Sequence, residues 1–216
     1  MLLQNARSGM CKDAEEMKTT LIDAWKKVDP AAGQLGAAKD EPSKGADLGV
    51  VAEIGWVAAQ NGLVELAVWC SQRAAGALTL PPRVRSELTA NLVALSGLGD
   101  TKGTLAPSAL DVHKDVVNRT DQALSSLVRF HDAAGIQDAC QLIWTASLPL
   151  QQPNLRHQLT RVYTAAANAL EAVGSSLNRL RTALHLELAY CYVAEDMPVL
   201  ANAQVAKVER CTLTPG

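Results

Sequence analysis

The sequence has few aromatic residues, no long apolar run and no excess of charge of one sign. Only 4% of its 216 residues are aromatic, and no stretch reaches the about 18 consecutive apolar residues that a membrane span requires. The opening MLLQNARSGM contains no apolar run as long as that of a signal peptide, so we expect a cytosolic chain that binds no membrane. The formal net charge of −2 gives no general attraction for polyanions, so we expect no nucleic-acid partner.

The signatures of metal, nucleotide and thiol chemistry are missing as well. The five cysteines are scattered, whereas disulfide frameworks and zinc sites use close pairs, so we expect reduced thiols. No two of the four histidines have the i, i+4 spacing that places two imidazoles on one helix face. In GLGDTKGT, Lys102 precedes Gly103, whereas the lysine of a phosphate-binding loop follows the last glycine. We therefore expect no metal, no cofactor, no small-molecule substrate and no enzymatic activity.

One histidine stands in an apolar context. His185 lies between Leu184 and Leu186. This pattern favours a partly buried histidine that is bonded to a neighbouring side chain over a metal ligand.

Alanine, leucine and valine dominate the sequence, of which 48% is hydrophobic. Alanine and leucine are strong helix formers, and apolar residues recur at intervals of three and four, which is the period of one helix face. No segment has the alternation of a strand. The pattern predicts helices over about 13–28, 48–60, 63–78, 82–95, 108–134, 136–150, 153–173, 176–194 and 197–211.

The predicted helices fall into pairs. Gly55 leaves room for a close crossing in the first pair, and helix pairs about forty residues long are typical of tetratricopeptide, HEAT and armadillo proteins. The expected fold is all-α, a tetratricopeptide-like α-solenoid of antiparallel helix hairpins. The predicted N-terminal helix in 1–29 is a candidate for the end of a preceding repeat, and a flexible Pro- and Gly-rich linker follows over 30–47. A helical-repeat array is predicted over 48–211, followed by a tail over 212–216. The hairpins of the array are predicted at about 48–78, 82–134, 136–173 and 175–211.

The stretch WTASLPLQQPNLRHQL, residues 144–159, predicts a corner between two helices. Pro149 ends the first helix because proline donates no amide hydrogen bond, and Pro153 fits the first turn of the next helix. We predict a structural corner of Trp144, Pro149, Pro153 and Leu155, in which Trp144 is a buried anchor.

A modest basic patch of Arg156, His157 and Arg161 follows this corner. Two interpretations stay open. The arginine bonds the free carbonyl groups that end the preceding helix, or the patch receives an acidic segment of a partner.

The same corner resembles a known family. The residues that carry the resemblance are Trp144, Leu148, Pro149, Leu150, Gln152, Asn154, Leu155, Arg156, His157 and Leu159, and further along Leu180, Arg181, His185, Glu187, Ala189, Glu195, Asp196 and Ala201. From about residue 120 to 210 the sequence resembles an internal segment of the cilia- and flagella-associated protein 46 family, which are large tetratricopeptide-like proteins of axonemes.

The resemblance implies a structural subunit of the central apparatus, in a projection on one of the two central microtubules, that helps to regulate ciliary motility. It implies other central-apparatus proteins as partners, a place in the cytoskeleton of the ciliary or flagellar axoneme, and a chain that is a piece of a longer protein. It supplies no catalytic residues.

An autonomous adaptor is the rival interpretation. Many tetratricopeptide-type domains bind a short peptide of a cytosolic partner in a groove that concentrates basic residues on one inner face. The basic residues of this sequence are dispersed, which favours the scaffold. A separate piece of a helical array exposes apolar end faces, so we also expect marginal stability or self-association.

Overall fold

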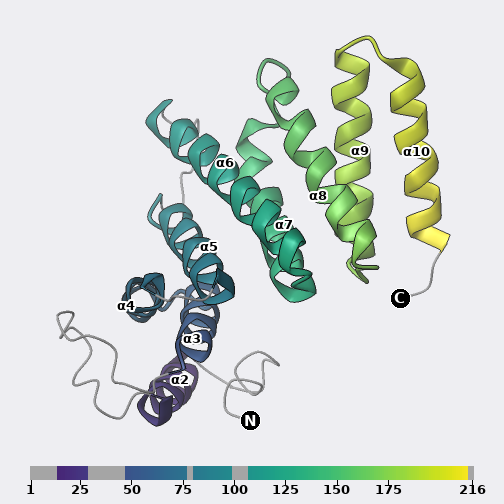
Figure 1. Ribbon diagram of the computed structural model, residues 1–216. Coiled ribbons are helices and arrows are strands. Elements are labelled where there is room, and N and C mark those ends of the chain that lie inside the picture. Colours follow the sequence, from purple (N-terminus) through teal and green to yellow (C-terminus); the bar gives the residue numbers. More distant parts are fainter. Residues whose placement is uncertain (1–13, 29–46, 77–79, 99–106, 214–216) are drawn as a thin grey trace. The chain divides into compact units, whose positions relative to one another are not determined.

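The computed structural model describes residues 14–28, 47–76, 80–98 and 107–213. Every regular element in these ranges is a helix, which confirms the all-α expectation (Figure 1). Most of the predicted linker, the loop at 99–104 and the end of the predicted tail lie outside the described residues. Within the described ranges, no helix combines the length and the apolarity that crossing a membrane requires.

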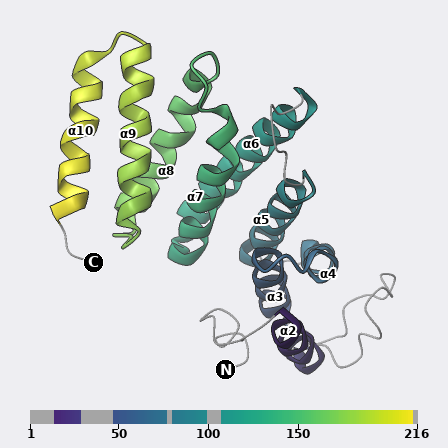
Figure 2. The ribbon, with the colours of Figure 1, turned by 180° about the vertical axis from the view of Figure 1, so that it is seen from behind.

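The chain divides into two compact units, Met1–Gly97 and Leu98–Gly216. Figure 2 shows the helices of each unit from behind. The N-terminal unit contains α2 (Ala14–Val28), α3 (Leu48–Gln60), α4 (Val64–Ala75) and α5 (Leu80–Ser96). The C-terminal unit contains α6 (Pro107–Phe130), α7 (Ala133–Ser147), the 3-10 turns η1 (Leu148–Leu150) and η2 (Arg156–Leu159), α8 (Thr160–Ala172), α9 (Asn178–Ala194) and α10 (Pro198–Leu213).

A close crossing of α3 and α4 organises the N-terminal unit. The Asp47 side chain caps α3 by accepting a hydrogen bond of 2.9 Å from the Gly49 amide. Gly62 has a φ of 72°, which a glycine adopts without strain, and it turns the chain into α4. A Cβ atom on Gly55 would lie only 2.7 Å from the Cβ atom of Cys70, so the predicted need for glycine at this crossing is confirmed.

The grouping of the N-terminal helices differs from the sequence prediction. The first helix was a candidate for a preceding repeat, but α2 packs on α3 and places Leu21 and Trp25 in the same core as Val51 and Trp69. The Trp25 and Trp69 rings meet edge to face with their centroids 4.4 Å apart. The predicted hairpin over 82–134 is also wrong, because α5 packs against α3 and α4 and lies in a different unit from α6.

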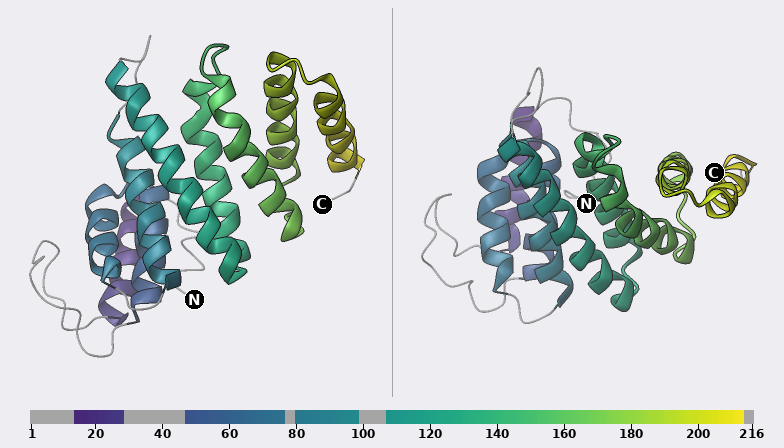
Figure 3. Two further views of the ribbon diagram at one scale, coloured as in Figure 1. Left: turned by 45° about the horizontal axis from the view of Figure 1, so that its top comes forward. Right: turned by 90° about the horizontal axis from the view of Figure 1, so that it is seen from above.

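In the C-terminal unit each helix packs chiefly on its neighbours in the sequence (Figure 3). The α6–α7 pair makes extensive contacts, and the predicted pairing of α9 with α10 is present in the structure. The sequence predicted a helix over about 108–134. Instead α6 ends at Phe130, His131 adopts the positive φ of 54°, and Gly135 lies in the first turn of α7. A Cβ atom on Gly135 would lie 2.6 Å from both Asp132 and Leu127 atoms, so close packing is the reason for this glycine.

Candidate interaction site

The predicted corner between α7 and α8 is longer than the sequence suggested. Pro149 lies in the 3-10 turn η1 directly after α7, but Pro153 lies in an irregular turn, and α8 begins only at Thr160. The prediction that the next helix starts at Pro153 is therefore wrong. The amides of Leu155 and Arg156 both donate to the Gln152 carbonyl at 2.9 Å, so the chain turns back on itself before the helix begins.

Tyr163 of α8, not Trp144, is the fully buried aromatic residue at this corner. Tyr163 is 0% exposed, whereas Trp144 is only partly buried, with ring centroids 6.1 Å apart. The Tyr163 hydroxyl lies 2.7 Å from Ser147 Oγ and accepts a hydrogen bond of 2.9 Å from Gln151 Nε2. Burial raises the pKa of Tyr163. The sequence prediction missed Tyr163, although its place four residues after Leu159, on the same helix face, was a signal that identifies it.

Arg156 connects the corner to α9. Its Nη2 atom donates to the Gln151 carbonyl at 2.9 Å, and its Nε atom lies 3.4 Å from Glu187 Oε2. Its guanidinium also stands 5.3 Å from the centre of the Tyr190 ring. Leu155, beside it, is partly buried. The structural interpretation expected an arginine that bonds the free carbonyl groups ending the preceding helix; Arg156 bonds one carbonyl group, that of Gln151 just after η1.

The other two residues of the basic patch lie on the surface. His157 is exposed. Arg161 has a side chain that is 74% exposed, and its Nη2 atom lies 2.8 Å from Oδ2 of Asp121, whose side chain is only 6% exposed. Arg161 therefore compensates a buried carboxylate of α6. Two of the three residues of the basic patch, Arg156 and Arg161, are thus already bonded within the protein.

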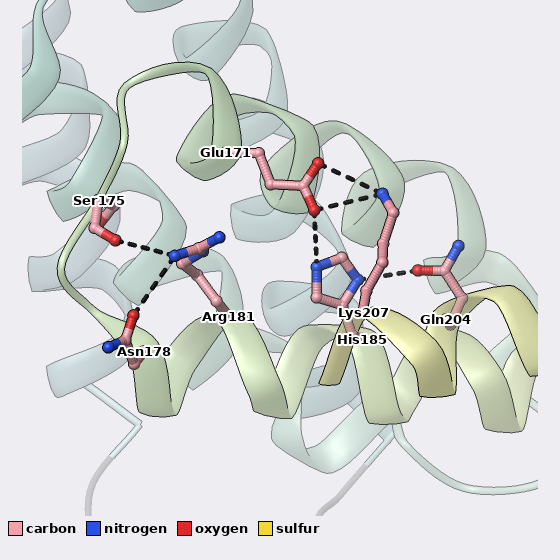
Figure 4. A network of polar contacts seen from close by, with 7 residues as sticks. All are labelled: Glu171, Ser175, Asn178, Arg181, His185, Gln204 and Lys207. Atoms are coloured by element: carbon pink, nitrogen blue, oxygen red, sulfur yellow. Dashed lines mark hydrogen bonds and ion pairs between the residues drawn. The ribbon is translucent and has the colours of Figure 1, made fainter. Parts of the chain in front are cut away.

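A polar junction joins α8, α9 and α10 (Figure 4). His185 is 0% exposed, with Nδ1 2.8 Å from Gln204 Oε1 of α10 and Nε2 3.1 Å from Glu171 Oε1 of α8. The Lys207 ammonium of α10 lies 3.3 Å from each oxygen of the same carboxylate. The expectation of a histidine bonded to a neighbouring side chain is confirmed by the contact with Gln204, but its burial is complete and not partial. Both partners come from other helices, which the apolar residues beside His185 did not indicate.

The start of α9 has a polar contact of its own. Arg181 Nη1 donates to the Ser175 carbonyl and to Asn178 Oδ1, both at 3.3 Å (Figure 4). The Ser175 hydroxyl accepts the Leu177 amide at 3.2 Å. These bonds fix the turn from α8 into α9 and orient the helix that carries His185.

Large apolar side chains remain exposed on α9, on α10 and in the turn between them. They are Leu186, Tyr190, Val193, Met197, Val199, Leu200 and Val205. Leu186, Tyr190 and Val193 follow one another at intervals of four and three, so they share one face of α9. We call these three residues the α9 stripe. Because Arg156 stands over the Tyr190 ring, the predicted corner flanks this stripe.

The described residues contain no group of three or more side chains suited to hold a metal ion. Burial raises the pKa of Cys70 and of Cys140 to about 12, which keeps these thiols protonated and unreactive near neutral pH. The α9 stripe, with the Arg156 guanidinium at its edge, forms an exposed apolar surface that is suited to contact with another protein.

The described residues define an all-helical protein of packed, consecutive helices. No family model matches the chain. The chain is 39% identical, over 188 residues, to cilia- and flagella-associated protein 46 of Chlamydomonas reinhardtii, and the predicted resemblance is confirmed. The match covers 87% of this chain, so it reaches well into the N-terminal half, beyond residues 120–210. The chain spans 6% of the length of that relative.

Proposed function

We propose that the chain is a non-enzymatic structural scaffold of cilia or flagella. In this role it makes protein–protein contacts in the central apparatus of the axoneme and helps to regulate ciliary motility. The likeness to a cilia- and flagella-associated protein supports this proposal, because it covers 87% of the chain. For the helices we propose a tetratricopeptide-like α-solenoid, in which consecutive helix pairs bury their apolar faces against one another.

The α9 stripe is the contact surface of this scaffold. Val193 is 64% exposed and Tyr190 is 57% exposed, whereas many other large apolar side chains of the described residues are buried. The occupant is an amphipathic helix of another axonemal protein, whose apolar face covers the stripe. Three apolar side chains at helical spacing present a ridge of the kind that packs into the groove of a second helix. Arg156 at the edge of the stripe favours a partner helix with a carboxylate beside its apolar face.

Crosslinking with mass spectrometry on isolated axonemes tests this function. Lys207 of α10, whose side chain is 33% exposed, is the reporter residue, because it contacts Glu171, which also contacts His185, the sequence neighbour of Leu186. We expect Lys207 to crosslink to a central-apparatus protein, and Val193→Glu to reduce that crosslink about tenfold or more, because a buried charge disrupts an apolar contact. Val128→Glu, at a 39% exposed valine of α6, is the matched control and is expected to leave the crosslink intact.

A Lys207 crosslink that persists in Val193→Glu would exclude the stripe as the contact surface. Absence of the protein from the axoneme would refute the scaffold function itself. Equal loss of the crosslink in both variants would show a general loss of folding or incorporation, and would also contradict the assignment to α9.

A further inference from the structure

Tyr190 is the central residue of the α9 stripe and its only aromatic side chain. All three tyrosines of the chain lie in its described part: Tyr190 is 57% exposed, Tyr163 is 0% exposed and Tyr192 is partly buried. Aromatic side chains are frequent anchors of protein interfaces. An exposed side chain loses rotamer freedom when a partner covers it, and this loss weakens binding. An anchor that is held in one orientation beforehand therefore binds more tightly.

The Arg156 guanidinium stands over the Tyr190 ring. Its Cζ atom lies 5.3 Å from the ring centre, within the range of cation–π attraction. Arg156 belongs to η2 and Tyr190 to α9, so this contact joins two different elements. The attraction favours the rotamer of Tyr190 that keeps the ring beside the guanidinium over the other staggered rotamers.

Three contacts fix Arg156 itself. Its Nη2 atom donates to the Gln151 carbonyl at 2.9 Å, and its own carbonyl accepts from Cys191 Sγ of α9 at 3.5 Å. Its Nε atom forms an ion pair with Glu187 Oε2 at 3.4 Å. Both of these atoms are buried and neither makes a hydrogen bond, so each charge compensates the burial of the other only while they stay together. Glu187 lies one turn before Tyr190 on α9, so the ion pair keeps the guanidinium at this ring.

We propose that Arg156 is a positioning residue, which holds Tyr190 in the orientation in which this ring anchors the partner helix. The inference rests on the proposed function of the α9 stripe. A planar guanidinium bonds a carbonyl group at its edge while it lies over a ring, whereas the compact, strongly hydrated ammonium group of lysine does not keep both contacts. The ordering of one side chain before binding is expected to strengthen the contact about two- to tenfold.

Side-chain NMR of the whole chain tests the positioning without a partner. Three-bond couplings of Tyr190 are expected to show one χ1 rotamer in the wild type and averaging between rotamers in Arg156→Lys. Arg161→Lys, at the patch arginine that pairs with Asp121, is the matched control and is expected to leave the couplings unchanged. The buried Tyr163 is the internal reference for an intact corner. Averaged couplings in the wild type, or a single rotamer in Arg156→Lys, would overturn the proposal.

A second variant covers a disturbed corner. If the Tyr163 reference changes in Arg156→Lys, Glu187→Gln removes only the ion pair and is expected to give the same averaging of Tyr190. A single Tyr190 rotamer in Glu187→Gln would then contradict the proposal.

The Lys207 crosslink in isolated axonemes tests the anchor. Arg156→Lys is expected to reduce it about two- to tenfold. In a Tyr190→Leu background, which keeps an apolar side chain but no ring, the same change is expected to cause no further loss, because a positioning residue acts through the ring that it holds. A further loss there would show that Arg156 acts on the partner directly, against the proposal. Absence of the crosslink from wild-type axonemes would refute the proposed function, while the Tyr190 couplings still decide the positioning.

Discussion

At Gly55, α3 comes so close to α4 that a Cβ atom would lie only 2.7 Å from the Cβ atom of Cys70, whereas α8, α9 and α10 meet around the buried side chain of His185 and the partly exposed Glu171. In the first region the contact is made by small and apolar groups over the T-shaped pair of Trp25 and Trp69. Its stabilisation comes from apolar burial and close packing, which have little directional preference. In the second region, hydrogen bonds and ion pairs of defined geometry fix which helices meet.

The two regions therefore differ in what disturbs them. Apolar packing responds to lost volume, while a polar junction responds to a lost hydrogen-bond or ion-pair partner. The N-terminal unit also contains polar contacts, such as the hydrogen bond of 2.8 Å from Ser86 Oγ to the Ser71 carbonyl and the ion pair between Arg85 and Glu53, but both of these come from α5. The α2–α4 core and the α8–α10 junction are thus the clearest pair to compare.

Truncation of tryptophan in each unit is expected to give the largest difference. Trp25→Ala removes a side chain that is 2% exposed, and we expect it to lower the free energy of unfolding by about 3–5 kcal/mol. Trp144→Ala removes a partly exposed side chain, and its expected cost is at most about 2 kcal/mol. Denaturant unfolding followed by circular dichroism measures both losses. A larger loss for Trp144→Ala would restore Trp144 as the anchor of the corner.

A lost polar partner is expected to have a smaller effect, confined to the C-terminal unit. Arg161→Ala leaves the buried Asp121 carboxylate without this ion pair and is expected to cost about 1–3 kcal/mol, although Arg161 itself is exposed. His157→Ala, at the exposed neighbour in the basic patch, is the control and is expected to change stability by less than about 0.5 kcal/mol. Equal stability of the two variants would show that polar contacts do not hold this unit together.

The buried thiols are expected to act alike in the two units. Burial raises the pKa of Cys70 and of Cys140 to about 12, so folding favours the protonated thiol. This contribution is complete below about pH 9 and is lost as pH rises toward 12, at about 1.4 kcal/mol per pH unit and thiol. Cys70→Ala and Cys140→Ala are each expected to reduce the alkaline slope of stability by that amount. An unchanged slope in either variant would show that its thiol is accessible in the folded unit.

Apolar periodicity was sufficient to predict the helices and the close crossing at Gly55, because spacing along the chain determines which side chains share a helix face. It was insufficient for the pairing of α5, since an apolar stripe does not specify which neighbour covers it. The delayed start of α8 depends on bonds to the Gln151 and Gln152 carbonyls, which residue types alone did not reveal. The partners of His185 and Arg161 are 14 to 40 residues away in sequence, a distance that local patterns do not bridge.

The distribution of tryptophan has a practical consequence for spectroscopy. Trp25, Trp56 and Trp69 lie in the N-terminal unit, and Trp144 is the remaining one of the four. Indole emission from the whole chain therefore reports mainly on one half of the molecule. Tryptophan fluorescence of a Trp144→Phe variant comes from the first unit alone. Replacement of Trp25, Trp56 and Trp69 leaves Trp144, beside Tyr163, as the single tryptophan. Fluorescence can therefore monitor the unfolding of the two halves separately.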